Sequence, residues 1–327
     1  MLLLNREDIK RIFTMRDAIE ADKLAYSIFS KGKCLSPLRT NFASGNENGN
    51  ILFMPGYAAD IGVAGLKIVS VFPDNSKYDL PVTPGTVLLV DDKTGVVTSV
   101  LDGTYITEVR TGAASGAAID LLAREGSETA ALIGTGGQAE SQFDAIIAAC
   151  DTVKTVKVFS RTQEKREAFA KKMQDKYSGK VEVVASSSAD EAVTDSDIIV
   201  LVTTSKNAII NGDKLKKGAL VCGVGSYMPT MHEIDEKTLI RADKIYFDSK
   251  DAVLSEAGCI ITPLKEGKIS EDKFTGDLGD MINGNIVSRE NDDEIIVFKS
   301  VGISTQDLVT GKAIYDKAIE NKVGYEF

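Results

Sequence analysis

The sequence predicts an α/β protein in which a doubly wound parallel sheet occupies the second half of the chain. From residue 129 onward, short apolar runs alternate with helix-length segments; the runs are "TAALIG", "TVKVFS", "VEVVAS", "DIIVLVTT", "ALVCGVG", "KIYFDS" and "EIIVFKS". Such runs are typical of parallel strands, because helices cover both faces of a parallel sheet. Before residue 129 the pattern differs and predicts a mostly antiparallel sheet with helices, which is an α+β arrangement.

The N-terminal elements follow from local patterns. An amphipathic helix is expected over residues 15–31, and extended segments follow in "LRTNFAS", "GNILFMPGY", "VAGLKIVSVFP" and "GTVLLVDDKTGVVTSVLDG". Residues 91–95 form the loop of a hairpin within the last segment. A long helix over about 106–124 leads into the glycine-rich strand. The helical C-terminal segment comes after the last strand of the parallel sheet, so we expect it to pack back on the N-terminal part.

These expectations define two domains. At 327 residues and 43% hydrophobic content, the chain can bury a large core, and two domains are typical of this length. We expect residues 1–118 with 303–327 to form one domain, split between the two ends of the chain. Residues 119–302 form the other.

Charge and composition exclude several classes of function. Lysine and arginine number 38 against 48 acidic residues, a net charge of −10, and no basic cluster suggests contact with nucleic acid or an anionic membrane. No apolar run has the length of a signal peptide core or a membrane span, so we expect a cytoplasmic protein. His232 is the single histidine and the four cysteines are dispersed, which argues against a metal site. Acid–base chemistry would fall to lysine, a carboxylate or tyrosine.

The stretch "TAALIGTGGQAE" carries a dinucleotide-binding fingerprint, Gly134-x-Gly136-x-x-Ala139, between a predicted strand and a predicted helix. Gly134 permits the tight turn, Gly136 lets the backbone approach a pyrophosphate, and Ala139 allows the helix to pack closely on the strand. The alternative is a glycine turn that binds no ligand. The α/β elements that follow favour a Rossmann domain with a cofactor.

The end of the second predicted strand bears on the choice of cofactor. NAD sites usually place an acidic residue there to bind the ribose diol. This chain has Ser160, Arg161 and Thr162 instead. An arginine with two hydroxyl neighbours suits a 2′-phosphate, so NADP(H) is preferred and NAD(H) remains possible. The alternative is that Arg161 is an exposed loop cation.

Three cations in the first domain are candidate ligands of a substrate carboxylate. Lys67 lies within the apolar strand "VAGLKIVSVFP", where burial would lower the pKa of its ammonium group. Arg110 is expected to begin the regular part of the long helix, where a cation opposes the helix dipole and suggests an anionic partner. Arg39 stands in an uncharged extended segment. The alternatives are a lysine that snorkels to an edge and arginines in surface salt bridges.

Motifs along the full length of the chain resemble the ornithine cyclodeaminase/mu-crystallin family. The matching segments are "MPGY…GLKIVSVFPDN", "LDGTYITEVRTGAASGAAIDLLA", "LIGTGGQAESQ", "VFSRTQEKREAFA", "VGSYMPTMHEID", "GDLGDMINGN" and "EIIVFKSVGISTQDL". The resemblance implies a Rossmann domain joined to a split domain that binds the substrate and forms a homodimer. It also implies that Arg39, Lys67 and Arg110 hold the carboxylate of an amino or imino acid, with Lys67 close to the reacting carbon. The residues expected at the cofactor are Thr111, Gly134, Gly136, Gly137, Gln138, Ala139, Ser160, Arg161, Thr162, Thr203, Gly225, Lys299 and Gly302.

Two departures from the cyclodeaminase pattern bear on the reaction. Cyclodeaminases carry an aspartate where this chain has Tyr227, and an acidic residue just before a Met-Pro pair, where this chain has Leu52. Both carboxylates of the cyclisation chemistry are therefore absent from these positions. Tyr227 is either a proton donor to an imine or a lid residue.

The leading functional hypothesis is an NAD(P)H-dependent oxidoreductase that transfers hydride between nicotinamide and the α-carbon of a small imino or amino acid. The substrate would be a cyclic ketimine such as pyrroline-2-carboxylate, or pyruvate with ammonia giving alanine. One alternative is ornithine cyclodeaminase, which converts ornithine to proline and ammonia with bound NAD. A second is an NADPH-dependent small-ligand binding protein of the mu-crystallin type.

Overall fold

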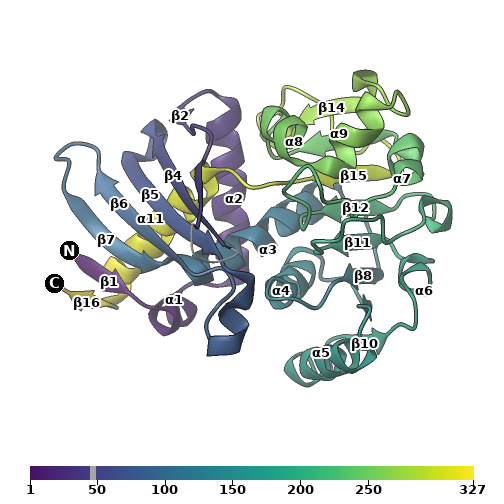
Figure 1. Ribbon diagram of the computed structural model, residues 1–327, viewed down its shortest axis with the longest axis horizontal. Helices are drawn as coiled ribbons and strands as arrows, with labels where there is room; N and C mark the ends of the chain where they lie inside the picture. The colour runs from purple at the N-terminus through teal and green to yellow at the C-terminus, as the bar shows by residue number, and fades with distance from the viewer. Residues whose placement is uncertain (45–48) are drawn as a thin grey trace. The chain divides into compact units, whose positions relative to one another are not determined.

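The computed structural model describes residues 1–44 and 49–327. The chain divides into two compact units: unit 1 comprises Met1–Arg110 with Ile303–Phe327, and unit 2 comprises Thr111–Gly302. The predicted division after residue 118 falls inside helix α3 (Gly103–Leu122), which runs through the boundary between the units (Figure 1).

Unit 1 is built on one mixed sheet of eight strands. The strand order is β16-β1-β7-β6-β5-β4-β2, and β3 pairs with β4. All pairs are antiparallel except β1 with β7, so the predicted antiparallel character is confirmed for most of the sheet. The strands are β1 (Leu2–Leu4), β2 (Cys34–Leu35), β3 (Thr40–Ala43), β4 (Asn50–Ala58), β5 (Val63–Val71), β6 (Gly85–Asp91), β7 (Val97–Asp102) and β16 (Tyr325–Glu326).

Helices cover one face of this sheet. Helix α11 (Ser304–Asn321) packs on β4, β5 and β6, and α1 (Arg6–Ile12) and α2 (Met15–Ser30) pack against α11 (Figure 1). Asn5 and Thr14 begin α1 and α2 with capping boxes, which satisfy backbone N–H groups of the first turn. The prediction that the final helix packs back on the N-terminal part is confirmed.

The two faces of the unit 1 sheet differ in burial. Side chains that face α11 are buried, among them Leu52, Met54, Val87, Leu89 and Leu101. The alternate positions are apolar as well, yet they are only partly buried; they are Ile51, Phe53, Leu66, Ile68, Leu88 and Val100. An antiparallel sheet with a solvated face normally carries polar residues there, so this second face is unusually apolar.

Unit 2 is a parallel sheet of eight strands in the order β10-β9-β8-β11-β12-β15-β13-β14. All its pairs are parallel, as predicted. The strands are β8 (Thr129–Ile133), β9 (Thr155–Phe159), β10 (Glu182–Ala185), β11 (Ile198–Leu201), β12 (Leu220–Gly223), β13 (Lys244–Phe247), β14 (Phe274–Asp277) and β15 (Ile296–Lys299). Strand β14 was not expected, because "FTGD" contains a glycine and has no apolar run.

Short helices connect these strands. They are α4 (Ala139–Ala149), α5 (Gln163–Lys176), α6 (Ala189–Val193), α7 (Glu236–Arg241), α8 (Lys250–Glu256), α9 (Gly258–Lys265) and α10 (Leu278–Ile282). A small residue of α3 allows a close approach to α4, because a Cβ atom at Gly112 would lie 2.5 Å from the carbonyl oxygen of Ser141. In the described part of the chain, no helix has both the length and the apolar character that a membrane crossing requires.

Candidate functional site

The glycine-rich turn of unit 2 connects β8 to α4. Gly134 has φ +117°, and a Cβ atom there would lie 2.7 Å from the carbonyl oxygen of Val202, so this position needs glycine for its fold. Gly136 and Gly137 are exposed, and a Cβ atom at either would meet nothing within 4 Å. The packing of the fold therefore gives no reason for glycine at these two positions, whereas close approach of a ligand does.

The backbone at this turn is ready to bind an anion. Among the described residues, the N–H groups of Gly136, Gly137 and Gln138 have no hydrogen-bond acceptor. They lie directly before α4, a helix of 11 residues, whose N-terminus carries the positive end of the helix dipole. The buried side-chain oxygen of Gln138 also has no partner in this part of the chain. Three adjacent donors at a helix start fit a pyrophosphate.

The end of β9 presents the residues considered for the ribose. Arg161 is exposed and makes no ion pair among the described residues. A second cation is close, because Arg166 donates a hydrogen bond to the carbonyl of Ser160 at 3.2 Å and lies over the ring of Phe159. The Ser160 hydroxyl donates to the carbonyl of Thr162 at 3.3 Å. The carboxyl end of β9 therefore carries two positive charges.

Three residues expected at the cofactor have partners within unit 2. The fully buried carboxylate of Glu233 accepts hydrogen bonds from the N–H groups of Thr203, Gly225 and Ser226. Lys299 is also fully buried and donates to the carbonyls of residues 223 and 300, 3.6 Å from Glu233. A Cβ atom at Gly225 would clash with the backbone of Thr203. Internal packing therefore explains the lysine at 299 and the glycine at 225, and a cofactor contact at either position stays a prediction.

Two further expected residues lie at the ends of unit 2. Gly302 has φ +83°, and its N–H donates to the buried carboxylate of Asp248, which also binds the Ser300 hydroxyl. This N–H is therefore already engaged. Thr111 lies in α3, and its carbonyl accepts a hydrogen bond from Gln142 at 2.8 Å.

Tyr227 follows β12. Its ring is partly buried and packs on the apolar core of unit 2. This packing holds the ring in place and is compatible with a proton donor and with a lid residue.

The cations of unit 1 form a buried cluster around a carboxylate that the sequence did not single out. Lys67 is 1% exposed, and its Nζ lies 2.5 Å from Oδ2 of Asp307, which is 0% exposed. The other carboxylate oxygen, Oδ1, accepts a hydrogen bond from Nε of Arg110 at 3.2 Å. We call these three residues the Lys67–Asp307–Arg110 cluster. The snorkelling interpretation of Lys67 is wrong, because its ammonium group stays buried.

Two glycines let α11 bring Asp307 to the sheet. Gly56 on β4 and Gly65 on β5 are directly paired across the strands. A Cβ atom at either would lie within 3 Å of the side chain of Leu308. Glycine in a strand often marks such a close approach. Leu308 fills the space above the glycine pair, so its neighbour Asp307 reaches Lys67.

The position of Arg110 differs from the prediction. Helix α3 begins at Gly103, so Arg110 is about two turns inside the helix and not at its start. The dipole argument therefore does not apply to it. Its significance comes instead from burial beside Asp307.

The cluster has a surplus of positive charge. The pKa of Lys67 is lowered from its ordinary 10.5 to about 7, mainly by burial and also by the positive charges of Arg110 and Arg39, although Asp307 acts in the opposite direction and raises it. Arg39 is half-buried and close enough to influence Lys67. Two buried cations thus share one carboxylate, with a third cation nearby. Such a site favours an additional anion.

A second layer fixes the start of α11. The side-chain oxygen of Gln306 accepts from the N–H of Ile303 at 3.0 Å, and its amide group donates to Asp22 and to the hydroxyl of Tyr26. All of these groups are buried. Asp307 was missed in the sequence, because its polar surroundings "STQD" look like an ordinary helix start and only the structure shows that they are buried.

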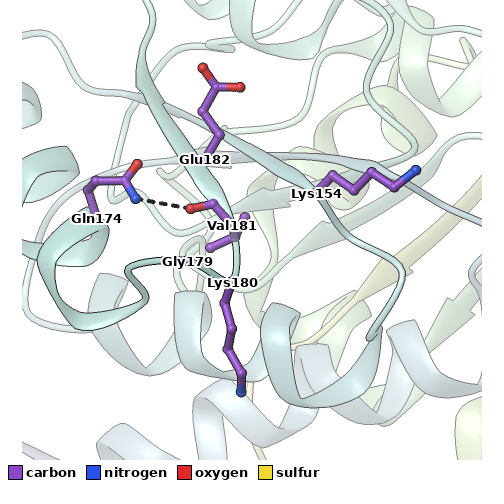
Figure 2. Close-up of a pocket in the computed structure, with 6 residues that line it drawn as sticks. All are labelled: Lys154, Gln174, Gly179, Lys180, Val181 and Glu182. Atoms are coloured by element: carbon purple, nitrogen blue, oxygen red, sulfur yellow. Dashed lines mark hydrogen bonds between the residues drawn. The ribbon is translucent and has the colours of Figure 1, made fainter.

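Unit 2 also has a surface hollow of about 390 Å³, lined by Lys154, Gln174, Gly179, Lys180, Val181 and Glu182 (Figure 2). It is next to the starts of β9 and β10, at the amino ends of these parallel strands. Ligands of doubly wound sheets bind at the carboxyl ends. We therefore do not assign it to the cofactor.

Comparisons with known proteins agree with this fold. A family model described as the ornithine cyclodeaminase/mu-crystallin family matches residues 1–322. A Δ1-pyrroline-2-carboxylate reductase of Bacillus cereus is 37% identical over 324 residues, which is 99% of this chain and 98% of the relative.

Solved structures match over the same extent. Thermococcus litoralis Δ1-pyrroline-2-carboxylate reductase, in complex with NADH and L-proline, is 37% identical with a TM-score of 0.94 over 100% of both chains. An archaeal alanine dehydrogenase dimer with bound NAD is 29% identical with a TM-score of 0.91, over 100% of this chain and 98% of that one. The resemblance inferred from motifs is confirmed: the chain belongs to the ornithine cyclodeaminase/mu-crystallin family.

Proposed function

We propose that this protein is an NAD(P)H-dependent imine reductase that converts a small cyclic imino acid, such as Δ1-pyrroline-2-carboxylate, to the amino acid. The observation that carries the proposal is the surplus positive charge of the Lys67–Asp307–Arg110 cluster. A buried cation without a matching anion is costly, so the site suits a carboxylate ligand. The names of the pyrroline-2-carboxylate reductases among its relatives support the choice of substrate.

In this proposal the residues of unit 1 bind the substrate. The guanidinium groups of Arg110 and Arg39 and the ammonium group of Lys67 would hold the carboxylate, which fixes the orientation of the C=N bond. Lys67 would also supply the proton that the nitrogen needs during reduction, because an ammonium group whose pKa is near 7 gives up a proton readily.

The residues of unit 2 would bind the cofactor. The N–H groups of Gly136, Gly137 and Gln138, which have no acceptor within residues 1–44 and 49–327, fit the pyrophosphate of a dinucleotide. Ala139 is fully buried, which keeps α4 close to β8. When bound, NAD(P)H supplies the hydride that is transferred to the α-carbon of the imino acid.

A steady-state assay tests the proposal. Oxidation of NADPH and NADH would be followed with pyrroline-2-carboxylate, with pyruvate plus ammonium, and with ornithine in the absence of added cofactor. We expect turnover of the cyclic imine, and a loss of at least tenfold in kcat/KM for Arg110→Ala. Lys33→Met, which removes an exposed unit 1 cation paired with Asp60, serves as the control and should retain full activity.

Other outcomes of this assay would replace the proposal. Turnover of pyruvate with ammonium alone would make the protein an alanine dehydrogenase. Formation of proline and ammonia from ornithine would make the protein a cyclodeaminase. Leu52 disfavours this outcome, because cyclodeaminases have an acidic residue at that position, whereas Leu52 is packed in an apolar cluster with Met54 and Val69. Tight NADPH binding without any turnover would leave a small-ligand binding protein.

We further propose a preference for NADPH, although the solved relatives contain NADH or NAD. Arg161 is exposed without an ion pair among the described residues at the end of β9, and Arg166 adds a second positive charge beside it. A charge-assisted contact to phosphate contributes about 2 kcal/mol. Arg161→Ala should therefore raise the KM for NADPH about 30-fold and leave the KM for NADH nearly unchanged, with Lys171→Ala on α5 as the control. Equal effects on both cofactors would contradict a phosphate-binding role.

We also propose that the protein is a homodimer that works in the cytoplasm, where NAD(P)H is available. The second face of the unit 1 sheet is apolar and partly exposed, as an interface between copies requires. The archaeal alanine dehydrogenase is itself a dimer. Light scattering should report twice the monomer mass, and Leu88→Glu on this face should lower it, whereas Val96→Glu at the hairpin tip should not. A monomer mass for the unmodified protein would contradict the proposal.

A further inference from the structure

The Lys67–Asp307–Arg110 cluster contains a carboxylate that substrate binding alone does not explain. Lys67 and Arg110 could hold a substrate carboxylate without help, and a carboxylate between them competes for the same cations. Asp307 nevertheless engages both, at 2.5 Å from Lys67 and 3.2 Å from Arg110, and is fully buried. Burying a carboxylate is expensive, so Asp307 contributes something that the cations cannot.

We propose that Asp307 is a positioning residue that keeps Lys67 protonated and in place, so that Lys67 can give its proton to the substrate nitrogen. This inference rests on the proposed imine reduction. In that step the C=N double bond becomes a single bond, as the carbon gains a hydride and the nitrogen gains a proton. One N–H bond of Lys67 breaks as the new N–H bond forms. Lys67 is left as a neutral amine and regains a proton from water.

The surroundings of Lys67 explain why it needs this carboxylate. Arg110 on α3 and Arg39 before β3 both disfavour its charge, and burial does so most strongly. The residues directly opposite on the neighbouring strands, Met54 on β4 and Val87 on β6, do not ionise. Asp307 on α11 favours the charged form through its hydrogen bond and its negative charge. Without Asp307, a buried lysine near two guanidinium groups would be neutral at physiological pH and would have no proton to give.

The start of α11 holds this carboxylate rigidly. Gln306 is bound by the N–H of Ile303 and in turn binds Asp22 and Tyr26 on α2. The same glutamine oxygen lies 3.5 Å from Nη1 of Arg110. Asp22 and Tyr26 therefore contact the cluster by way of Gln306. These hydrogen bonds fix Gln306 and thereby restrict the side chain of the adjacent Asp307.

The pH profile of kcat/KM tests the inference, because it reports the ionisation of groups in the free enzyme. Activity should fall as pH rises through the pKa of Lys67. Asp307→Asn keeps the shape of the side chain but removes its charge. The fall of kcat/KM at high pH, which we call the alkaline limb, should therefore move to lower pH by at least about one unit. Asp307→Glu should retain the limb near its original position. Asp316→Asn, an exposed residue on the same helix paired with Lys312, is the matched control and should change nothing.

A carboxylate with a purely structural role would give a different result: activity would fall by the same factor at every pH, and the limb would not move. That result would overturn the inference. If Asp307→Asn does not fold, Arg110→Met provides the second test. Arg110 disfavours the charge of Lys67, so its removal should move the limb to higher pH. An unmoved limb in that variant would also overturn the inference.

A measurement without turnover separates this inference from the proposed function. The protein would be labelled with ¹³C at the lysine Cε, and the Lys67 resonance would be assigned by its loss in Lys67→Met. Its midpoint of titration should be lower in Asp307→Asn than in the unmodified protein. If no imino acid is reduced but the midpoint still shifts, the proposed reaction fails while the effect of Asp307 on Lys67 is retained. An unchanged midpoint refutes the role of Asp307 whatever the substrate.

Discussion

Replacing Lys67 by methionine should abolish activity and yet stabilise the protein. Methionine has nearly the same length and shape as the lysine side chain and suits a buried, irregular space. The substitution removes one of the two cations that share Asp307, and it leaves Arg110 and Asp307 as a balanced pair. The prediction follows from the charge surplus of the cluster, which function requires and folding does not.

The size of the effect can be worked from the ionisation of Lys67. Its pKa falls from 10.5 to about 7 in the folded protein, mainly because of burial. In the unfolded chain the lysine is fully protonated at pH 7, so folding at this pH costs about 4 kcal/mol for this group. Because methionine packs imperfectly in place of lysine, we expect a gain of about 2 to 4 kcal/mol in the free energy of unfolding.

The sign of the pH dependence is a sharper test than the gain itself. Below about pH 7 both the folded and the unfolded protein hold the Lys67 proton, and the cost of burying the charge is fully present. Between about pH 7 and 10.5 the folded protein releases the proton first, so the cost shrinks as pH rises. The advantage of Lys67→Met should therefore be largest at about pH 6 to 7 and should decline toward about pH 9.

Thermal and urea unfolding without cofactor, at several pH values, measure this difference. Lys33→Met is the control, because it removes an exposed lysine and should change the free energy of unfolding by less than about 0.5 kcal/mol. Two results would contradict this prediction. Lys67→Met could be less stable than the unmodified protein at pH 7, which would mean that the pair with Asp307 outweighs the cost of burial. The difference could also be the same at every pH, which would mean that Lys67 does not titrate as described.

Four further substitutions test unit 2. Gly136→Ala should leave the midpoint of thermal unfolding unchanged but weaken NAD(P)H binding at least tenfold in a fluorescence titration. Gly134→Ala should lower the midpoint of thermal unfolding, because φ at this residue is +117° and the new Cβ atom would lie 2.7 Å from the carbonyl oxygen of Val202. Glu233→Gln should cost about 2 kcal/mol in urea unfolding, since an amide N–H₂ would face a backbone N–H that the carboxylate now binds. Asp277→Asn should stabilise the protein by about 1 to 2 kcal/mol at pH 7, because burial and neighbouring carboxylates raise the pKa of Asp277 to about 6. The cost of burying its negative charge is present above about pH 6 and disappears as pH falls toward about 4. Urea unfolding at about pH 7 and at about pH 4 checks this dependence.

Much of the fold could be predicted from local patterns. The seven apolar runs after residue 129 all became strands of the parallel sheet, because helices cover both faces of such a sheet and favour apolar side chains in its strands. The hairpin loop at 91–95 was equally clear, and Gly95 adopts φ +72° there. Strand β14 escaped prediction, since a four-residue edge strand such as "FTGD" is determined by its neighbour β13 and not by its own composition.

The site was predicted less completely. Lys67 and Arg110 were recognised because a cation in an apolar context is conspicuous in a sequence. Asp307 was missed, because it lies 240 residues from Lys67 and nothing local marks it as a partner. Lys299 was expected at the cofactor, and its buried contacts to Glu233 and two carbonyls give it an internal role that no local pattern could indicate.

The two kinds of sheet, the glycine-rich turn and the family could be recognised from local patterns, because hydrophobic periodicity and glycine spacing act over a few residues. Which charged side chains come into contact depends instead on how distant segments pack together. The pairing of Gly56 with Gly65 admits Leu308, and this close packing brings Asp307 to Lys67. The ionisation of a buried lysine depends on desolvation and on charges a few ångströms away, and these arise from residues far apart in the chain.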